Sequence, residues 1–515
     1  MKRNLKILTG AILLFTFAVQ TAVAAPYTGK LTFPLQSNQT NAVLGDYYVM
    51  STLENIQWGC LPNRDTPAIL TVPSGSAVTF DTVSHEGLLE DQGRDPVKYF
   101  GQYGISADMV LDDAKQIAAS DNQHDFLADG PHVVTGPIAV EGAEPGDVLK
   151  VEVLELTPRV PYGVISNRHF KGALPEFPEK ERSDDASAAN PEAYGDVSVF
   201  CPIHQENGVW YGEIEDNDQT IKFPISPFLG IMGVAPNTSE KVSSVPPINV
   251  GGNLDINELG VGSTLYLPVE VAGANFYTGD PHFVQGDGEV ALTALEGSLR
   301  GTVRLTLLKA GDPAIPQTSE KFIQAFAETE KYWIPIGLNT DLDEAMVQSV
   351  RESVNFLSRQ LGLDRAKVYA YLSAGADYEV SQVVDKTKGI HALIPKADFS
   401  DIIKLTLYAA GKPIKVQVVD NQFYVPLRET LEALGYTVEW EEGSTSILLS
   451  RDDKLTRVTP NSNVYLADGQ RIVCAGGAYL SGQEVAMLPV STLSEVLKLP
   501  VNWSTTGLNV TGIVE

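Results

Sequence analysis

The segment from Gly279 to Glu289 holds the densest group of side chains that could do chemistry. It contains Asp280, His282, Asp287 and Glu289, and three glycines that let the backbone approach a ligand closely. Carboxylates and imidazoles bind divalent metals and act as general acids and bases. Strand-like runs flank the segment, so we expect it to form a turn between strands. Gly-Asp and Asp-Gly pairs also mark ordinary polar turns, and that interpretation stays open.

Four further candidates lie far away along the chain. Asp81 and His85 follow a strand-like run, His132 stands in Gly-Pro-His, and Asp255 ends Gly-Gly-Asn-Leu-Asp. Site residues often occupy such strand ends, and a second histidine beside His282 would suit a catalytic zinc site with one open position. A lone histidine is more often a surface or capping residue, and Asp255 could simply close an Asx-turn.

The usual nucleophile motifs are absent from the sequence. It has no Gly-x-Ser-x-Gly elbow and no phosphate-binding Gly-x-x-x-x-Gly-Lys. Three cysteines, Cys60, Cys201 and Cys474, are too few for a disulfide scaffold, although a Cys60–Cys201 bridge stays open. Cys201 has His204 nearby, but isolated cysteines are more often inert.

Composition excludes one class of partner. The 515 residues carry a formal charge of −28, and nucleic-acid binding depends on clustered Lys and Arg. We therefore expect no nucleic-acid partner. A 43% hydrophobic content indicates a folded protein, with length for about three domains.

The N-terminus has the features of an export signal. Lys2 and Arg3 precede an apolar run, and Ala22-Val23-Ala24 forms a small-residue cleavage site. We expect residues 1–24 to be a signal peptide, and the protein to be secreted or associated with the cell envelope.

Residues 26–398 should form one mainly β domain. Short β-branched runs between Gly/Pro turns predict a β-sandwich or barrel-like body, with amphipathic helices over 344–361 and 365–374. The polar segment 159–223 is interpreted as an insertion near the mouth of the site. All seven histidines lie at or before His391, so histidine chemistry belongs to this domain.

Residues 400–515 contain an internal repeat with a constant offset of 63 residues. Each copy predicts a strand, a helix and a strand, and a unit this short cannot bury its apolar face alone. We therefore expect one small α+β domain in which the copies pack on each other. The pairs are Pro426/Pro489, Leu434/Leu497, Val438/Val501, Trp440/Trp503 and Ile447/Val510.

Several motifs in order make residues 40–396 resemble the acetamidase/formamidase family. They include Thr135-Gly136-Pro137-Ile138, Gly251-Gly252-Asn253-Leu254-Asp255, and Gly279-Asp280 followed by His282 and Gln285-Gly286-Asp287-Gly288-Glu289. The tail is similar to the copper amine oxidase N-terminal-like domain through Val425-Pro426-Leu427-Arg428 and Val438-Glu439-Trp440. Such tail domains carry no copper site, and here the tail is interpreted as a binding or surface-association module.

The resemblance implies a largely β, metal-dependent and oligomeric hydrolase of short carboxamides. From residue chemistry we predict a divalent metal, zinc, held by His85, Asp255 and His282. Glu289 is the predicted general base and acid, and Asp81 or His132 would orient a metal ligand.

The predicted activity is cleavage of the C–N bond of small linear amides to a carboxylate and ammonia. The expected partners are the small amide substrate, further copies of the chain in a homo-oligomer, and the cell wall or envelope through the tail. A cyclic amide (γ-lactam) hydrolase and a non-catalytic envelope binding protein are the alternatives.

Overall fold

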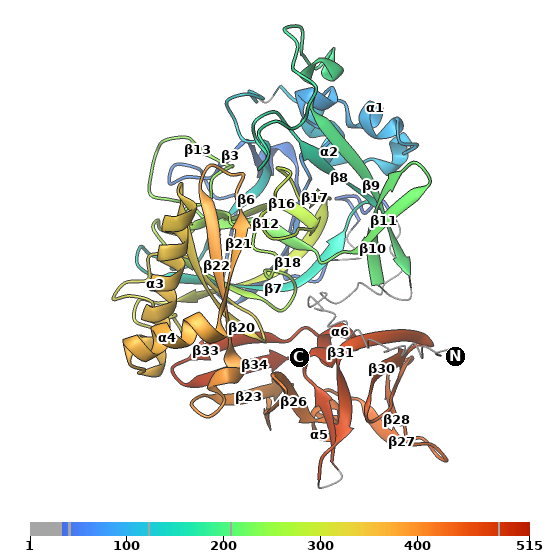
Figure 1. The fold of residues 1–515 in the computed structure, drawn as a ribbon, viewed down its shortest axis with the longest axis vertical. Helices are drawn as coiled ribbons and strands as arrows, with labels where there is room; N and C mark the ends of the chain where they lie inside the picture. The colour runs from blue at the N-terminus through green and yellow to red at the C-terminus, as the bar shows by residue number, and fades with distance from the viewer. Residues whose placement is uncertain (1–32, 40–42, 122–123, 207–208, 483–484) are drawn as a thin grey trace, which may run out of the picture.

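The computed structural model describes residues 33–39, 43–121, 124–206, 209–482 and 485–515. The predicted signal peptide over residues 1–24 lies outside this part of the chain. Most of the described chain is β-strand, arranged as a body above a C-terminal part (Figure 1). None of the described helices has the length and apolar character needed to cross a membrane.

Within the described residues, one sheet of the body has nine strands. It is mostly antiparallel, with a parallel pair at the β1 edge. In spatial order the strands are β1 (Tyr47–Val49), β5 (Ser76–Asp81), β18 (Leu299–Leu308), β7 (Val148–Pro158), β15 (Thr264–Pro268), β19 (Phe326–Glu328), β20 (Tyr332–Asn339), β22 (Lys388–Pro395) and β21 (Asp377–Gln382).

The second large sheet has eleven strands in the described chain. Its main path is β11 (Gln219–Pro224), β10 (Val209–Asp216), β9 (Val197–Glu206), β8 (Tyr162–Asn167), β17 (Leu295–Glu296), β16 (Phe276–Val284), β12 (Phe228–Val234) and β14 (Gly251–Asn253). Off this path, β6 (Val133–Val140) pairs with β16, β2 (Ile56–Trp58) and β4 (Leu70–Val72). A separate small pair joins β3 (Cys60–Leu61) to β13 (Val242–Ser243).

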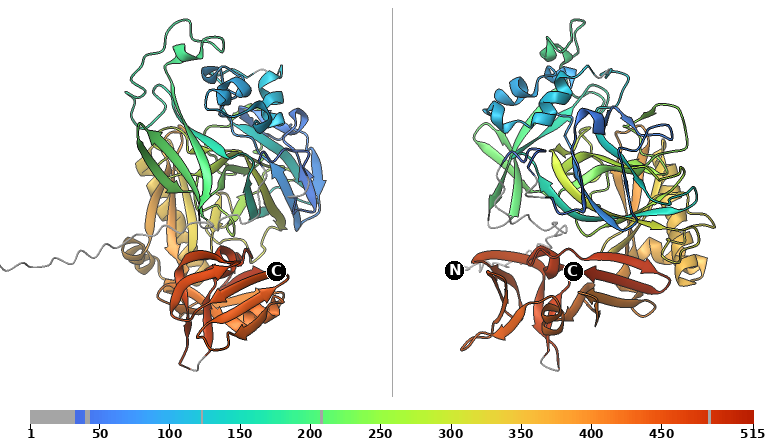
Figure 2. Two further views of the ribbon diagram at one scale, coloured as in Figure 1. Left: turned by 90° about the vertical axis from the view of Figure 1, so that its right-hand side faces the viewer. Right: turned by 180° about the vertical axis from the view of Figure 1, so that it is seen from behind.

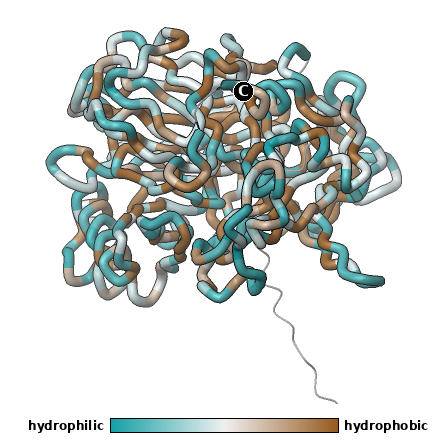
Figure 3. The backbone as a smooth tube through the Cα atoms, turned by 90° about the horizontal axis from the view of Figure 1, so that it is seen from above, coloured by the Kyte–Doolittle hydropathy of each residue, from teal (hydrophilic) through white to brown (hydrophobic). Residues whose placement is uncertain are grey.

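The two large sheets share one hydrophobic core. Phe80 of β5 meets Phe276 of β16 with ring centroids 5.8 Å apart, and both side chains are fully buried. Burying such a side chain contributes about 1.5–3 kcal/mol. Hydrophobic stretches of the chain run through the interior, whereas peripheral loops are largely hydrophilic (Figure 3). The predicted mainly β body is confirmed.

The helices lie at the margins of the body (Figures 1 and 2). Both predicted helices form: α3 (Leu342–Leu361) is amphipathic and packs on β20 and β22, whereas α4 (Arg365–Gly375), which follows it, buries Val368 and Leu372 but has little amphipathic character. Asp341 caps α3 by accepting hydrogen bonds from the amides of Asp343 and Glu344. Near the opposite end lie α1 (Pro96–Gly101) and α2 (Asp112–Ala119), and short 3-10 turns occur at η1 (Leu53–Asn55), η2 (Glu90–Gln92), η3 (Ala107–Met109), η4 (Pro191–Tyr194) and η5 (Lys396–Phe399).

Two local predictions are corrected. The 159–223 segment is not simply an irregular insertion, because it contains β8 and the antiparallel ribbon β9–β10–β11. The Gly279–Glu289 segment is a turn only in its second half. Gly279 to Val284 lie within β16, paired with β12 on one side and with β6 and then β17 on the other, and a turn follows in which the Glu289 amide donates to the Gly286 carbonyl. Pairing on both sides outweighs the turn preference of its Gly, Asp and Pro residues.

The C-terminal part is built from two sheets. The first, in order, is β24 (Lys412–Lys415), β23 (Lys404–Ala409), β34 (Asn509–Val514) and β33 (Asn502–Thr506). The second is β25 (Gln417–Val419), β26 (Gln422–Pro426), β32 (Ala486–Pro489), β31 (Gln470–Leu480), β30 (Ser462–Ala467), β29 (Lys454–Val458), β28 (Ile447–Arg451) and β27 (Thr437–Trp440). The helices α5 (Leu427–Ala433) and α6 (Ser491–Glu495) are equivalent elements of the repeat, and its copies pair directly through β26 and β32.

Buried polar contacts join this part to the body. Thr264 donates a hydrogen bond to the Trp503 carbonyl, 2.9 Å away, and Trp333 donates to Thr505 Oγ1 at 2.8 Å. The carboxylate of Glu328 accepts hydrogen bonds from Thr505 and from Lys396, which is completely buried. The tail therefore packs into the body as part of a shared core, including Trp333 and Trp503.

Candidate metal and hydrolytic site

The strands of the eleven-stranded sheet bring the candidate residues together. Asp280 and His282 lie two residues apart in β16, so their side chains lie on the same face. Gly230 of the neighbouring strand β12 leaves room for them. A Cβ atom at Gly230 would lie 2.5 Å from Asp255 Oδ1 and 2.8 Å from Asp280 Oδ2. The glycine is thus required by the close approach of these side chains.

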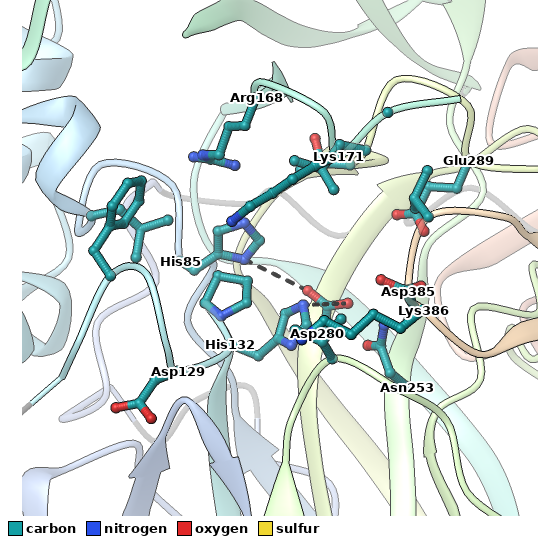
Figure 4. Close-up of a pocket in the computed structure, with 18 of the residues that line it drawn as sticks. His85, Asp129, His132, Arg168, Lys171, Asn253, Asp280, Glu289, Asp385 and Lys386 are labelled. Carbon is teal, nitrogen blue, oxygen red and sulfur yellow. Dashed lines mark ion pairs between the residues drawn. The ribbon is translucent and has the colours of Figure 1, made fainter. Parts of the chain in front are cut away.

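Asp280 is the centre of the cluster. His85 Nδ1 lies 3.7 Å from its Oδ1. His132 Nε2 and His282 Nε2 lie 3.7 Å and 3.1 Å from its Oδ2. Glu296 Oε1 is 3.0 Å from His282 Nε2. Figure 4 shows Asp280 below His85 and beside His132, with Glu289 and Asp385 on the other side of the pocket.

A second group of carboxylates adjoins the first. Ligand atoms of Asp255, Glu289 and Asp385 lie within 4.8 Å of one another, as do those of Asp255, Asp280 and His282. Asp255, Asp280 and Glu289 have φ angles of 49°, 48° and 46°. This left-handed region is strained for residues other than glycine, and such strain is concentrated at functional sites.

Many polar atoms of this cluster are buried without a hydrogen bond among the described residues. They belong to every metal ligand that the sequence predicted and to their acidic neighbours. Leaving such atoms unsatisfied would cost about 1–3 kcal/mol each. Their convergence fits a bound cation. The atoms are His85 Nδ1, both ring nitrogens of His282, both carboxylate oxygens of Asp255, Asp280 Oδ1, Glu296 Oε2 and Asp385 Oδ2, whereas His85 Nε2 faces Glu86 at 3.2 Å.

His132 gives an independent indication of a cation. Its Nδ1 contacts both the Ser244 hydroxyl at 3.0 Å and the Ser244 carbonyl oxygen at 3.2 Å, and it can donate to either. Burial lowers the pKa of His132 to about 4, despite the charge of Asp280, so the ring is neutral near pH 7. In the tautomer with the proton on Nδ1, which the Ser244 carbonyl oxygen accepts, the Nε2 lone pair faces the Asp280 carboxylate. Two electron donors facing each other are the arrangement that a metal ion binds.

The surroundings shift the pKa values of these carboxyl groups in different directions. Burial and the charges of neighbouring carboxylates raise the pKa values of Asp255 and Glu289 well above their usual range. Burial also opposes ionisation of Asp280, but His132 and His282 hold its pKa below the usual value. Burial and mutual repulsion therefore disfavour the ionised cluster, and a cation would offset both.

A pocket of about 430 Å³ gives access to the cluster. His85, His132, Asp280, Glu289 and Glu296 line its polar side. Phe126, Leu127 and Phe170 line the outer part, together with Arg168 and Lys171. Phe170 and Lys171 come from the segment 159–223, which the sequence had predicted to lie near the mouth.

The structure assembles five of the six predicted site residues: His85, His132, Asp255, His282 and Glu289. It links them through Asp280, which belongs both to a His85–His132–Asp280 group and to an Asp255–Asp280–His282 group.

The role predicted for Asp81 is corrected. Its Oδ1 accepts a hydrogen bond from Arg300 Nε at 2.7 Å, and its Oδ2 accepts one from Tyr48. Arg159 lies 3.7 Å away. These partners occupy a buried structural network in which Asp81 contacts no candidate ligand. Asp81 is close to His85 in sequence, but its carboxylate faces two arginines, with which it forms stronger charge-assisted contacts.

Glu86 has the orienting position instead. Its Oε1 lies 3.2 Å from His85 Nε2 and also accepts a hydrogen bond from Arg168 at 3.1 Å. Sequence reasoning missed Glu86, Glu296 and Asp385 as site residues. Glu86 could have been identified from its position next to His85, and Asp385 from its position just after the β21 segment. Glu296 had no local signal.

The cysteine alternatives are not supported. Cys60, Cys201 and Cys474 are all free. Burial raises the pKa of the Cys201 thiol, which disfavours the reactive thiolate. His204 contacts Glu206 at 2.9 Å.

Comparison with known sequences decides the family. The profile of the acetamidase/formamidase family matches residues 105–242 and 238–401. The chain belongs to this family. The copper amine oxidase N-terminal domain profile matches residues 408–511, as the tail motifs predicted.

Individual relatives agree with the family assignment. A formamidase of Methylophilus methylotrophus is 27% identical over 213 residues, which are 35% of this chain and 52% of the relative. An acetamidase of Mycolicibacterium smegmatis is 28% identical over 211 residues, 31% of this chain and 49% of the relative. The chain thus spans about half the length of the curated relatives it matches.

A solved structure supports the fold. The crystal structure of an acetamidase from Bacillus halodurans matches with a TM-score of 0.50 and 24% identity, covering 69% of this chain and 99% of that one. At this identity the likeness concerns the fold alone.

Proposed function

We propose that the chain is a metal-dependent amidohydrolase that cleaves the C–N bond of small linear amides to a carboxylate and ammonia. The observation that carries this proposal is the buried group of three histidines around Asp280, at the base of the pocket, in a member of the acetamidase/formamidase family. The relatives named formamidase and acetamidase support an amide substrate.

His85, His132 and Asp280 would hold a divalent metal, zinc in our proposal, and Asp255 and His282 complete the ligand set on the other side of Asp280. Three imidazoles favour zinc over magnesium or calcium, which prefer oxygen ligands. When bound, the metal supplies a Lewis acid that polarises the amide carbonyl and lowers the pKa of water. Glu86 fixes the orientation of the His85 ring.

Glu289 moves the proton. It lies in one group with His282 and Glu296 and also faces the pocket. In the proposed reaction its carboxylate accepts a proton from the attacking water and returns it to the departing nitrogen, so that ammonia leaves. Such general acid–base catalysis contributes about 10²–10⁴-fold in rate. Phe126, Leu127 and Phe170 line the pocket and would contact the acyl group of the substrate.

The size of the pocket favours a second candidate substrate. A volume of about 430 Å³ exceeds the needs of formamide or acetamide and lies in the ordinary range for small-molecule sites. A cyclic amide such as a γ-lactam is therefore the second candidate, and a substrate panel of formamide, acetamide, longer linear amides and a γ-lactam distinguishes the two.

The deciding experiment combines metal analysis with ammonia release by the purified protein. We expect bound zinc, and activity lost on chelation and restored by zinc. Glu289→Gln should keep the metal and lose about 10²–10⁴-fold in turnover. Glu215→Gln, an exposed change on β10, is the control. Full activity of Glu289→Gln would remove Glu289 from the reaction. Protein without metal or turnover would instead support the non-catalytic envelope binding protein.

The location of the protein and its oligomeric state are also proposals. We propose export, on the strength of the N-terminal signal features, and association with the cell wall or envelope through the C-terminal part. A homo-oligomer is proposed from the family resemblance, and the mass in solution tests it.

A further inference from the structure

A second cluster of ionisable side chains lies outside the site described above. His391 of β22 is fully buried and faces Glu379 of β21 and Glu258, which follows β14 in the chain. His391 Nε2 lies 3.1 Å from Glu258 Oε2 and 3.6 Å from Glu379 Oε2. The two glutamate side chains are 18% and 31% exposed, so the cluster has one side open to solvent.

The histidine is oriented toward the two carboxylates. Its Nδ1 lies 2.8 Å from Ser381 Oγ, and this hydrogen bond fixes the ring. Its Nε2 and Glu258 Oε2 are both buried and make no hydrogen bond among the described residues. Within the described part of the chain, this completely buried imidazole nitrogen makes no hydrogen bond and faces two carboxylates at ion-pair distance.

The distances fit two ligands of one ion. Nitrogen and oxygen ligands lie about 2.0–2.2 Å from zinc. At octahedral to tetrahedral angles, a nitrogen and an oxygen on the same ion are therefore about 3.0–3.5 Å apart. The two observed separations, 3.1 Å and 3.6 Å, are close to this interval.

We propose that Glu258, Glu379 and His391 form a second divalent-cation site, suited to Mn²⁺ or Zn²⁺. One imidazole with two carboxylates is a mixed ligand set that such ions accept. Asp287 is a further carboxyl group beside His391 and Glu379, and burial raises its pKa to about 7. The site does not depend on the proposed amidase activity.

The second site would stabilise the first through three shared segments. Asp255 and Glu258 belong to one segment, Asp287 and Glu289 to another, and Glu379 and Asp385 to the third. Each segment therefore supplies one residue to the Asp255–Glu289–Asp385 group and one to the second cluster or its immediate surroundings.

Hydrogen bonds already connect these segments. Gln285 Nε2 donates to the carbonyl oxygens of Asp255 and Ser381, both at 3.0 Å. The Val383 amide donates to the Gly288 carbonyl at 3.1 Å. A cation at the second cluster would add a connection between the first and third segments and hold the carboxylates of the first site at fixed spacing.

The alternative occupant is a proton. Burial alone would lower the pKa of His391, but Glu258 and Glu379 raise it to about 9. Without a cation the cluster is an imidazolium paired with carboxylates. Binding of Mn²⁺ at pH 7 must then displace a proton.

The test is to count Mn²⁺ bound to the full chain, stripped with a chelator and dialysed against Mn²⁺, by electron paramagnetic resonance. The Glu258→Gln/Glu379→Gln double variant should bind one Mn²⁺ fewer per chain than the wild type and lose part of the Mn²⁺-dependent rise in Tm. Asp377→Asn, an exposed change in the same strand β21, is the matched control and should keep the full count. If the double variant does not fold, the single variant Glu258→Gln replaces it. We expect this variant to bind Mn²⁺ at the second site at least tenfold more weakly than the wild type.

An unchanged Mn²⁺ count and affinity in these variants would overturn the site and leave the imidazolium cluster. Loss of all bound Mn²⁺ would overturn its independence from the first site. His132→Ala should lose cation from the first site and ammonia release, yet keep the ion bound by Glu258. If neither the wild type nor any variant releases ammonia, the proposed function is refuted. The Mn²⁺ count would still decide whether the second site exists.

Discussion

Glu86 Oε1 lies 3.2 Å from Nε2 of His85, while Nδ1 of the same ring points toward Asp280. The ring is thus held between a carboxylate that contacts Arg168 and the carboxylate at the centre of the candidate metal site. Such an outer carboxylate fixes the orientation of a histidine ligand and increases its basicity. His85 is therefore a candidate metal ligand, whereas Glu86 is a positioning residue that acts on the metal through His85.

Replacement of Glu86 by glutamine should weaken metal binding without removing a ligand. We expect a loss of about 10–100-fold in zinc affinity, measured by competition with a chromophoric chelator. Glu54→Gln, an exposed change in η1, serves as the control. Unchanged zinc affinity in folded Glu86→Gln would show that His85 needs no positioning partner.

Asp81→Asn should affect stability and leave metal content unchanged. Removing one partner of a buried ion pair costs about 3–5 kcal/mol, and Asp81 serves both Arg159 and Arg300. Denaturant unfolding measures the cost, and elemental analysis measures the metal. A variant that lost its metal at full stability would restore the predicted role of Asp81 at the site.

The stability difference between the wild type and Asp81→Asn should depend on pH. Burial opposes ionisation of Asp81, but Arg159 and Arg300 hold its pKa below the ordinary value of 3.8. Because the folded-state pKa is lowered, its contribution is complete above pH 3.8 and is lost as the pH falls through the folded-state value. The stability difference between wild type and Asp81→Asn should therefore be constant near neutrality and shrink in acid below pH 3.8. A difference that grew on acidification would contradict this sign.

Gly230→Ala should disrupt the site through one methyl group. Its Cβ would lie 2.5 Å from Asp255 Oδ1, so the carboxylate or strand β12 must move. We expect metal affinity to fall about tenfold or more, and stability to fall by about 1–3 kcal/mol through overpacking. Gly286→Ala is the matched control, because nothing lies within 4 Å of its added Cβ. Equal metal affinities of the two variants would contradict the close approach at Gly230.

Particular residues show what the sequence could predict. The i, i+4, i+7 spacing of Val350, Val354 and Leu357 predicted α3, since these side chains lie on one face of a helix, and the structure buries Val354 and Leu357. The residue types of His85, Asp255, His282 and Glu289 indicated a site before any geometry. Local pattern could not place Asp280 in the middle of a strand, because pairing with β12 and β6 is a long-range effect. Nor could it distinguish Asp81 from Glu86, because Arg300 is brought to Asp81 only by the pairing of β18 with β5.

The body and the C-terminal part should unfold together. Thr505 Oγ1 accepts a hydrogen bond from Trp333 and donates one to Glu328, which also accepts hydrogen bonds from Tyr266 and from the buried Lys396. Thr505→Val keeps the shape but removes the hydroxyl, and it leaves Glu328 and Trp333 each short of one partner. The expected loss is about 1–3 kcal/mol, because buried polar groups lose their hydrogen bonds. Calorimetry should show one transition in the wild type, shifted to lower temperature in Thr505→Val. The exposed change Thr437→Val in β27 should leave it in place. Two separate transitions in the wild type would mean that the shared core of Trp333 and Trp503 does not couple the two parts.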